Sequence, residues 1–448
     1  MAKYAEEIIA ESVKDLKWSN AKAREKEIEK LINYYTGTNT EHYISRYFDA
    51  EVFQEVPLYK INITKKFIDK KSRVYTLSPN RKLKNQRISK AYKNLTLYKD
   101  LRMKHIERMT NLTGTPAVRI YWDQKNYEKQ CFGYDVVYYY NAFFGDDPYT
   151  PDAIVYPLLS ATQDPSNIQE PMFAYFDSEV QLIFNSDGII VDESPNPYGV
   201  LPFVFPRDMT QVDDFYGEGA TDVVNVNEHV NIAMTELMLG LRFQMFGQPF
   251  ATGVYDDKPL SRMGSDMIIN LPEGAQFGIE TPGGRPESVV EVIKFKLEML
   301  AMSRHMYVTF DSNMDRPSSG LALRIKDFEH QEDYKDDIEH WKLFEQEMYR
   351  LERSIAAVNG IELPEEMIVD FKEPEYPRGL GEQMGKDTWD LEKNLITLED
   401  IIKRDRSDIS TEEATKIIER NKEINESRLQ IDNSTEMPND GNRTRKNT

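Results

Sequence analysis

The feature of this sequence that most constrains its fold is a pair of helix-forming stretches, residues 221–246 and 286–306, separated by a short insert. Apolar residues of the first stretch recur at the three- and four-residue spacing of one helix face: Val223, Val226, Val230, Ala233, Leu237 and Leu241. Pro286 suits the first turn of the second stretch, and the insert 247–285 breaks into Gly, Pro and strand-like pieces. Because the two helices have similar lengths, we predict an antiparallel helical hairpin with the insert at its tip.

Polar residues interleave with the apolar stripe on the first of these helices: Asn225, Asn227, Glu228, Asn231 and Thr235. A helix with this mixture of faces has partners on more than one side, or it lines a water-filled space. Of these polar residues we single out Asn225, Asn231 and Thr235 as candidate site residues.

Upstream of the hairpin the pattern changes from helical to strand-like. The spacing of apolar residues predicts helices over 5–36, 58–77 and 86–113. Residues 118–122 then alternate, which places Val118, Ile120 and Trp122 on one face of a strand. Further β-rich runs follow at 134–140, 172–176, 180–184 and 189–191, and the turn residues 185–188 join two of them. We therefore predict a mostly antiparallel β region over 115–207 and an α+β fold class.

Downstream of the hairpin, a stretch rich in turn residues at 307–320 precedes a long amphipathic helix over 321–358. The apolar stripe of this helix weakens at 332–337, which indicates a bend or a change of packing partner. Asn359-Gly360 is a suitable helix end. A short strand is expected at 365–371.

The C-terminal segment begins with a Pro- and Gly-rich stretch, 372–388, which is typical of a linker. Thr397-x-x-Asp400 and Ser410-x-x-Glu413 each resemble an N-terminal capping box. They predict two short helices, the second over about 411–429. Residues 431–448 have almost no apolar content, so we expect a disordered tail.

The net charge of −20 is unevenly distributed along the chain. Residues 60–108 contain 16 Lys and Arg against Asp69, Asp100 and Glu107, which is +13, so the rest of the chain carries −33. An acidic protein does not coat DNA nonspecifically, because phosphate repulsion opposes it. The basic segment is either a solvated or intersubunit face that pairs with acidic neighbours, which we favour, or a contact surface for nucleic acid.

Several classes of protein fit this sequence poorly. It has no run of 18 apolar residues that could span a membrane, and its charged N-terminus lacks the apolar core of a secretion signal, so we expect a cytoplasmic protein. Cys131 is the only cysteine, which excludes an internal disulfide and a cysteine-based zinc site.

Signatures of catalysis are weak throughout the sequence. The string GLGEQMGKDT at 379–388 lacks the glycine spacing of a phosphate-binding loop, and Asp387 replaces the hydroxyl residue that would hold magnesium. The six histidines form no metal-binding pair, and the acidic pairs, such as Asp256-Asp257, are common in a chain with 76 acids. We therefore predict no catalytic residue, metal or cofactor, and a protein that is not an enzyme.

Three groups of residues, in this order and spacing, resemble the portal (head-to-tail connector) proteins of tailed double-stranded DNA phages. The first is Gly199-Val200-Leu201-Pro202-Phe203, then Phe215-Tyr216-Gly217-Glu218-Gly219 and a helix with Asp222-Val223-Val224 and Asn231. The second is Pro317-Ser318-Ser319-Gly320-Leu321-Ala322-Leu323, and the third is Asn394-Leu395-Ile396-Thr397 before an acidic helix. The resemblance covers about 240 residues. The first 115 residues match only in helical character.

The resemblance implies a portal fold with the following division of the chain. The wing would comprise residues 1–220 and 320–370, the latter with a long kinked helix and a strand. The stem would comprise the helices 221–246 and 286–306, with Asn225, Asn231 and Thr235 on the first, and the clip would be the insert 247–285. Residues 307–319 would be a tunnel loop, 371–430 the crown and 431–448 the tail.

The resemblance also implies a function. Portal proteins form dodecameric rings at one capsid vertex, through which DNA is packaged and ejected, so this chain would be assembled in the host cytoplasm and reside in the virion. Its partners would be other copies of itself, the terminase, a head-completion adaptor, the major capsid or scaffold protein, and double-stranded DNA. The residues nearest DNA would be Asp311, Ser312, Asn313, Met314, Asp315 and Arg316 of the tunnel loop, and Tyr216, Gly217, Ser319 and Gly320 would be motif residues.

The residues themselves agree with this interpretation at several points. A helical hairpin with a small insert at its tip is suited to form part of the wall of a channel. An acidic channel lets DNA slide, because contacts from Lys and Arg would hold the DNA in place. Two alternatives remain open. One is another virion structural or adaptor protein, and the other is a metal-dependent DNA-processing enzyme that uses scattered carboxylates.

Overall fold

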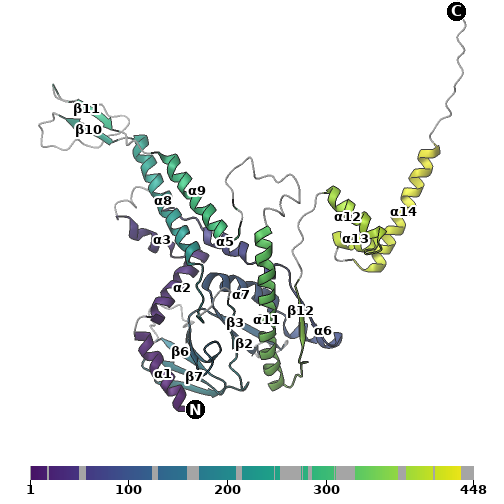
Figure 1. Cartoon of the computed structure of the whole chain (residues 1–448), viewed down its shortest axis with the longest axis horizontal. Coiled ribbons are helices and arrows are strands. Elements are labelled where there is room, and N and C mark those ends of the chain that lie inside the picture. Colours follow the sequence, from purple (N-terminus) through teal and green to yellow (C-terminus); the bar gives the residue numbers. More distant parts are fainter. Residues whose placement is uncertain are drawn as a thin grey trace, which may run out of the picture. The chain divides into compact units, whose positions relative to one another are not determined.

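The structure, a computed structural model, describes the chain except residues 1, 18–19, 50–56, 124–129, 159–170, 208–213, 247, 253–273, 275, 281–284, 307, 309–327, 372–379, 407–408 and 435–448. The chain forms two compact units. The first comprises Met1–Asp315 and Lys326–Pro374, and the second Arg316–Ile325 and Glu375–Thr448. Helices and strands are both abundant, as expected for an α+β chain (Figure 1).

The N-terminal helices of the first unit are shorter than their sequence patterns predict. They are α1 (Ala2–Lys17), α2 (Asn20–Thr36), α3 (Thr40–Ile44), α5 (Ile63–Lys71), α6 (Gln86–Leu95) and α7 (Lys99–Thr113), with single 3₁₀ turns η1 (Ser45–Tyr47) and η2 (Val74–Thr76). The predicted helix at 58–77 begins only at Ile63, because the Asn62 side chain accepts a hydrogen bond from the Lys65 amide and caps the helix there. The predicted helix at 86–113 is divided into α6 and α7.

The β region is antiparallel, as the sequence predicts, and its described strands form two sheets. The first, with strand order β3-β2-β9, contains β2 (Ala117–Asp123), β3 (Cys131–Val137) and β9 (Phe203–Val204). The second, in chain order, contains β4 (Asn141–Phe144), β5 (Pro151–Leu158), β6 (Met172–Phe176), β7 (Val180–Asn185) and β8 (Ile190–Pro195). Val118, Ile120 and Trp122 are all buried, and Gly188 has the positive φ of the predicted turn.

The predicted helical hairpin is confirmed. Helix α8 (Thr221–Phe246) and helix α9 (Pro286–Ser303) lie side by side, and Pro286 is in the first turn of α9. The insert contributes strands β10 (Gln248–Thr252) and β11 (Gln276–Glu280), which pair antiparallel. Figure 1 shows these strands at the far end of the two helices.

The long helix α11 (Phe328–Val358) ends as predicted, with Gly360 at positive φ. It is continuous through residues 332–337, where the sequence indicates a bend or a change of partner, and Tyr334 and Ile338 on either side of Asp336 are buried. Strand β12 (Met367–Asp370) also follows the prediction, but it pairs with an unexpected strand, β1 (Asn80–Leu83). No strand was predicted from the sequence at residues 80–83.

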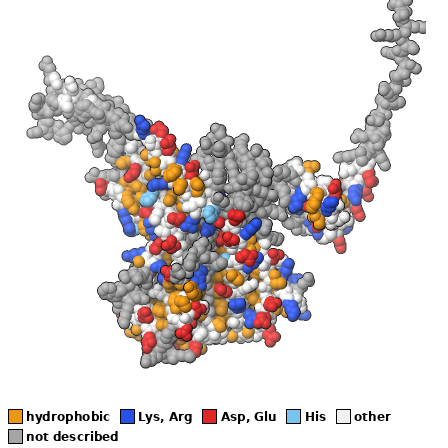
Figure 2. Space-filling view, in the orientation of Figure 1, with side chains coloured by type: hydrophobic (Ala, Val, Ile, Leu, Met, Phe, Trp, Pro, Cys, Tyr) orange, Lys and Arg blue, Asp and Glu red, His pale blue; other side chains and the backbone are white. Residues whose placement is uncertain are grey.

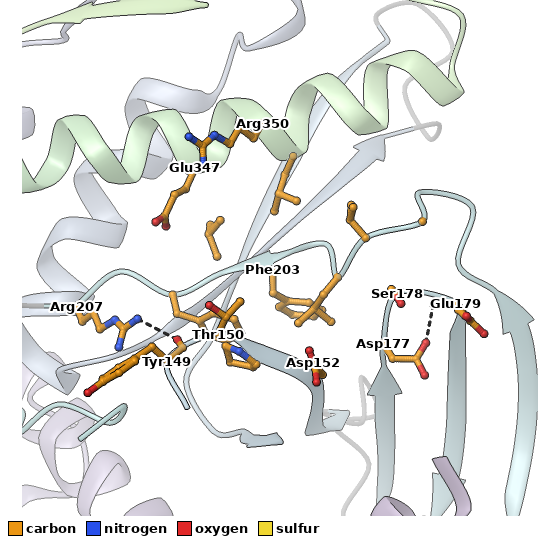
Figure 3. Close-up of a pocket in the computed structure, with 17 residues that line it drawn as sticks. Tyr149, Thr150, Asp152, Asp177, Ser178, Glu179, Phe203, Arg207, Glu347 and Arg350 are labelled. Carbon is orange, nitrogen blue, oxygen red and sulfur yellow. Dashed lines mark hydrogen bonds between the residues drawn. The ribbon is translucent and has the colours of Figure 1, made fainter. Parts of the chain in front are cut away.

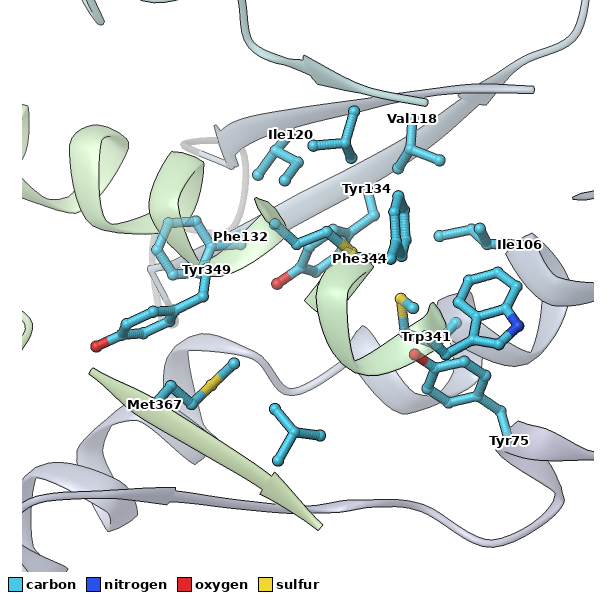
Figure 4. Packing of buried hydrophobic residues seen from close by; sticks show 14 of the residues in the cluster. Tyr75, Ile106, Val118, Ile120, Phe132, Tyr134, Trp341, Phe344, Tyr349 and Met367 are labelled. Carbon is cyan, nitrogen blue, oxygen red and sulfur yellow. The ribbon is translucent and has the colours of Figure 1, made fainter. Parts of the chain in front are cut away.

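The main hydrophobic core of the first unit joins segments that are distant in sequence. Figure 4 shows aromatic and aliphatic side chains of η2, α7, β2, β3, α11 and β12 pointing toward one another. Trp341 of α11 meets Tyr75 edge-to-face, with ring centroids 5.3 Å apart. The core thereby joins α6, α7 and the three-stranded sheet to α11 and β12.

The second unit contains helices α12 (Leu380–Glu392), α13 (Leu398–Asp405) and α14 (Thr411–Ser434). Both predicted capping boxes are present, at Thr397/Asp400 and at Ser410/Glu413. Two predictions need correction. The linker at 372–388 is helical from Leu380 onward, although Gly381 and Gly385 suggested otherwise, and α14 continues through residues 431–434, which were assigned to the tail. Residues 435–448 lie outside the described part of the chain.

Candidate functional site

The polar face of α8 holds an extended segment of the same chain. Asn227, Asn231 and Thr235 are four residues apart and therefore lie on one side of the helix, and all three are buried. The Ile61 amide donates to Oδ1 of Asn231 (2.8 Å), and the Tyr59 amide donates to Oγ1 of Thr235 (3.0 Å). The prediction of partners on more than one side of α8 thus applies to Asn231 and Thr235, whereas Asn225 is exposed.

Asn227 completes this set of contacts, and the sequence analysis did not select it as a site residue. Its Oδ1 accepts from the amides of Ile63 (2.6 Å) and Thr64 (2.9 Å), and its Nδ2 donates to the Ile61 carbonyl (3.0 Å). Buried backbone groups that belong to no strand ladder need such side-chain partners. The polar face therefore fixes the segment 59–64 against the base of α8.

The motif Phe215–Gly219 forms the junction that starts α8. The Gly217 amide donates to Oγ1 of Thr115 (2.9 Å), and the Ala142 amide donates to the Tyr216 hydroxyl (2.7 Å). The Arg24 guanidinium lies 3.6 Å from the centre of the Tyr216 ring. The motif residues predicted from the sequence, Tyr216 and Gly217, therefore lie together and connect α2, the β region and α8.

The close packing of this junction requires glycine. A Cβ atom at Gly219 would lie 2.5 Å from the carbonyl oxygen of Leu112 and 2.6 Å from Cδ1 of Leu31. Distances this short between real Cβ atoms and backbone essentially never occur, so the start of α8 can approach the end of α7 only without a side chain.

An ion pair and a histidine–carboxylate hydrogen bond hold the lower end of the hairpin. The Arg304 guanidinium, just after α9, donates to both carboxylate oxygens of Asp222 at the start of α8. His305 has a left-handed backbone (φ 51°), and its Nδ1 lies 2.8 Å from Oδ1 of Asp333 on α11. These contacts stand immediately before the predicted tunnel loop. The loop residues Asp311 to Arg316, and the motif residues Ser319 and Gly320, lie outside the described residues.

One face of α9 exposes apolar side chains to solvent. Val292, Phe295, Met299 and Met302 follow the 3-4-3 spacing of a single stripe, and their exposed fractions range from 49% to 66%. We call this set the α9 stripe. Figure 2 shows hydrophobic side chains gathered over α8 and α9 among charged ones. The sequence analysis did not single out this stripe, although its spacing was readable.

The basic segment 60–108 supplies charges to the interior as well as to the surface. Lys99 is fully buried, with its Nζ 2.8 Å from Glu352 and 3.1 Å from Glu345. Arg81 contacts Glu345 (2.6 Å) and Asp100 (2.5 Å). Burial alone would raise the pKa of Glu345, but Lys99 and Arg81 outweigh it and lower this pKa to about 2. Part of the positive charge is therefore neutralised within the chain.

A hollow of about 820 Å³ lies beside α11, the start of β5 and the segment 199–207. Figure 3 shows Glu347 and Arg350 of α11 above it and Arg207 at its edge, where the guanidinium donates to the Tyr149 carbonyl (3.1 Å). Burial raises the pKa of Glu347. The lining carries both signs of charge, so the hollow could bind polar groups. None of its residues was predicted as a site residue.

Neither a metal centre nor a membrane span is evident in the described part of the chain. Among those residues, no group of three or more His, Cys, Asp or Glu side chains could hold a metal ion. No described helix is both long and apolar enough to cross a bilayer. Comparison of the chain with protein families and with curated proteins found no match.

Proposed function

We propose that this chain is the portal protein of a tailed double-stranded DNA phage. Copies would assemble into a ring at one capsid vertex, and DNA would be packaged and ejected through its central channel. In this proposal α8 and α9 are the stem, β10 and β11 belong to the clip, and α12 to α14 lie in the crown. The terminase and a head-completion adaptor would dock on the ring, and another protein would hydrolyse ATP.

The observation that carries the proposal is the α8–α9 hairpin with its exposed stripe. The hairpin carries the paired strands β10 and β11 at one end and is fixed to the rest of the first unit at the other, through Asn227, Asn231 and His305. A rigid helical pair held at its base is suited to stand beside identical pairs in a ring. The α9 stripe leaves apolar surface that a neighbouring copy would remove from water.

The decisive experiment is negative-stain electron microscopy of the purified full-length protein, with native mass spectrometry as a companion. We expect closed rings with a central hole wide enough for a DNA duplex and a mass near that of twelve copies. A protein that stays a monomer or dimer under all assembly conditions would contradict the proposal. A Mg²⁺-dependent nuclease assay would then separate another virion component from a DNA-processing enzyme.

A further inference from the structure

Two surfaces of the first unit carry opposite charge and exposed apolar residues. The first, which we call the basic corner, lies on α6 and the start of α7: Arg87, Lys90, Lys93, Leu97, Leu101 and Arg102. All six side chains are exposed, and Leu101 is 72% exposed. Arg87, Lys90 and Lys93 make no ion pair with the described part of the chain. Lys99 and Arg81, in contrast, pair with carboxylates of the same unit.

The second surface, the acidic edge, lies on strand β8 and the turn before it: Asp187, Ile189, Ile190, Val191, Asp192 and Glu193. Among the described residues, strand β8 pairs only with β7, so it is an outer strand of the five-stranded sheet. Ile189 and Val191 are 62% and 61% exposed. Natural proteins usually protect such edges with Lys or with a covering element.

The stretch of sequence that contains this edge has no positively charged side chain. Residues 130–206 include 11 Asp and Glu but no Lys, Arg or His. Residues 60–108 carry +13, so the chain has segregated its charges into two blocks of opposite sign within one unit. Lys and Arg are common edge protectors, and their complete absence here indicates that the edge is covered in another way.

We propose that the basic corner of one copy docks on the acidic edge of a second copy. A contact between two identical corners or two identical edges would oppose like charges, so electrostatics selects the unlike pair. Figure 1 places α6 on the side of the unit away from α1 and β7, so one chain cannot bring its own two surfaces together. A contact between unlike surfaces repeats from copy to copy and can close a ring. This inference rests on the proposed ring assembly and names a contact for it outside the α9 stripe.

Disulfide trapping in the full-length protein tests the pairing directly. The native Cys131 is buried, so wild type provides a background without cross-links. We expect an equimolar mixture of Leu101→Cys and Val191→Cys proteins to give a dimer on mild oxidation, and the double variant to give a ladder of multimers. Neither single variant alone should cross-link. Dimers of Leu101→Cys with itself, or no cross-link in the mixture, would overturn the proposal.

Charge reversal provides a second, independent readout. Arg87→Glu with Lys90→Glu should reduce the yield of assembled protein at low salt at least tenfold, and so should Asp192→Lys with Glu193→Lys. Mixing the two variants should restore assembly. The matched control is Lys65→Glu with Lys66→Glu, two exposed lysines of the same basic segment on α5. Equal loss in this control would show that only total charge matters and would contradict the docking.

The outcomes separate this inference from the proposed function. Rings that persist in all variants, without cross-links, would remove the corner–edge contact and leave the portal proposal in place. If the cysteine variants cross-link as expected but form only open multimers that never close into rings, the contact would stand and the portal proposal would be contradicted. Loss of DNA binding on corner reversal, with no cross-links, would identify the basic corner as a nucleic-acid surface and overturn the contact between copies.

Discussion

Gly114 packs directly against the backbone of Gly217, so that a Cβ atom at Gly114 would lie 2.3 Å from the Gly217 carbonyl oxygen. Gly114 ends α7 with φ 85°, a backbone conformation that disfavours any side chain. The same contact brings the motif Phe215–Gly219 to the end of α7 and positions the start of α8. The geometry of the helical hairpin therefore depends on two glycines that are about a hundred residues apart.

Replacement of Gly114 should destabilise the protein more than its backbone angle alone explains. We expect Gly114→Ala to lower the free energy of unfolding by about 3 kcal/mol, from left-handed strain and overpacking together. Gly199→Ala is the matched control, since Gly199 also has positive φ (65°) but has open space around it. It should cost about 1 kcal/mol. Urea unfolding measures both, and equal losses would contradict the steric role of Gly217.

The hairpin could be predicted because its signal is local. Apolar spacing and Pro286 define α8 and α9 without reference to the rest of the chain, and the capping boxes at Thr397 and Ser410 are local in the same way. Strand β1 could not be predicted, since its four residues pair with β12 from the far end of the unit. Its partner β12 was predicted, but four residues are too few for β1 to show a periodic pattern of its own.

The candidate site was predictable only in part, for the same reason. The polar residues Asn231 and Thr235 stood out on an apolar helix, but their partners, Ile61 and Tyr59, precede them by 170 and 176 residues. Lys99 appeared to be one of 16 surface cations, because a sequence shows charge and not burial. Its carboxylate partners, Glu345 and Glu352, come from α11.

Asn231 should be the more sensitive of two matched asparagines on α8. Asn231 is buried, and Asn231→Ala removes its two hydrogen bonds to the Ile61 amide (2.8 Å) and carbonyl (3.2 Å), so we expect the free energy of unfolding to fall by about 2 kcal/mol. Asn225→Ala removes an exposed side chain from the same helix and should change it by less than about 0.5 kcal/mol. Chemical denaturation compares the two, and a neutral Asn231→Ala would show that the segment 59–64 is held by other contacts.

Glu107 should make stability depend on pH. Burial raises the pKa of its carboxyl from the ordinary 4.5 to about 7, although the amides of Val74 and Tyr75 donate to it. Between these values the folded protein holds a proton that the unfolded chain has released, so the free energy of unfolding falls as pH rises through this window. The drop amounts to at most about 3 kcal/mol.

Glu107→Gln cannot ionise. Its free energy of unfolding should therefore decline less than that of wild type between about pH 5 and about pH 7.5, the range in which Glu107 of the wild type titrates. Glu366→Gln, at an exposed glutamate, serves as the control and should keep the wild-type slope. Urea unfolding at a series of pH values measures all three proteins. Parallel curves for Glu107→Gln and wild type would show that Glu107 does not titrate in this range.

The α9 stripe should matter for assembly and not for the fold of one chain. Phe295 and Met302 are 62% and 66% exposed, so Phe295→Ser with Met302→Ser should leave the free energy of unfolding of the monomer within about 0.5 kcal/mol of wild type. Native mass spectrometry should nevertheless show loss of the ring, because the neighbouring copy loses its apolar contact. The control is Ile368→Ser on β12, where an equally exposed side chain (67%) lies away from the hairpin. Rings that survive the double substitution would exclude the stripe as the contact between stems, and the α8–α9 hairpin would then have to meet its neighbour through the exposed face of α8.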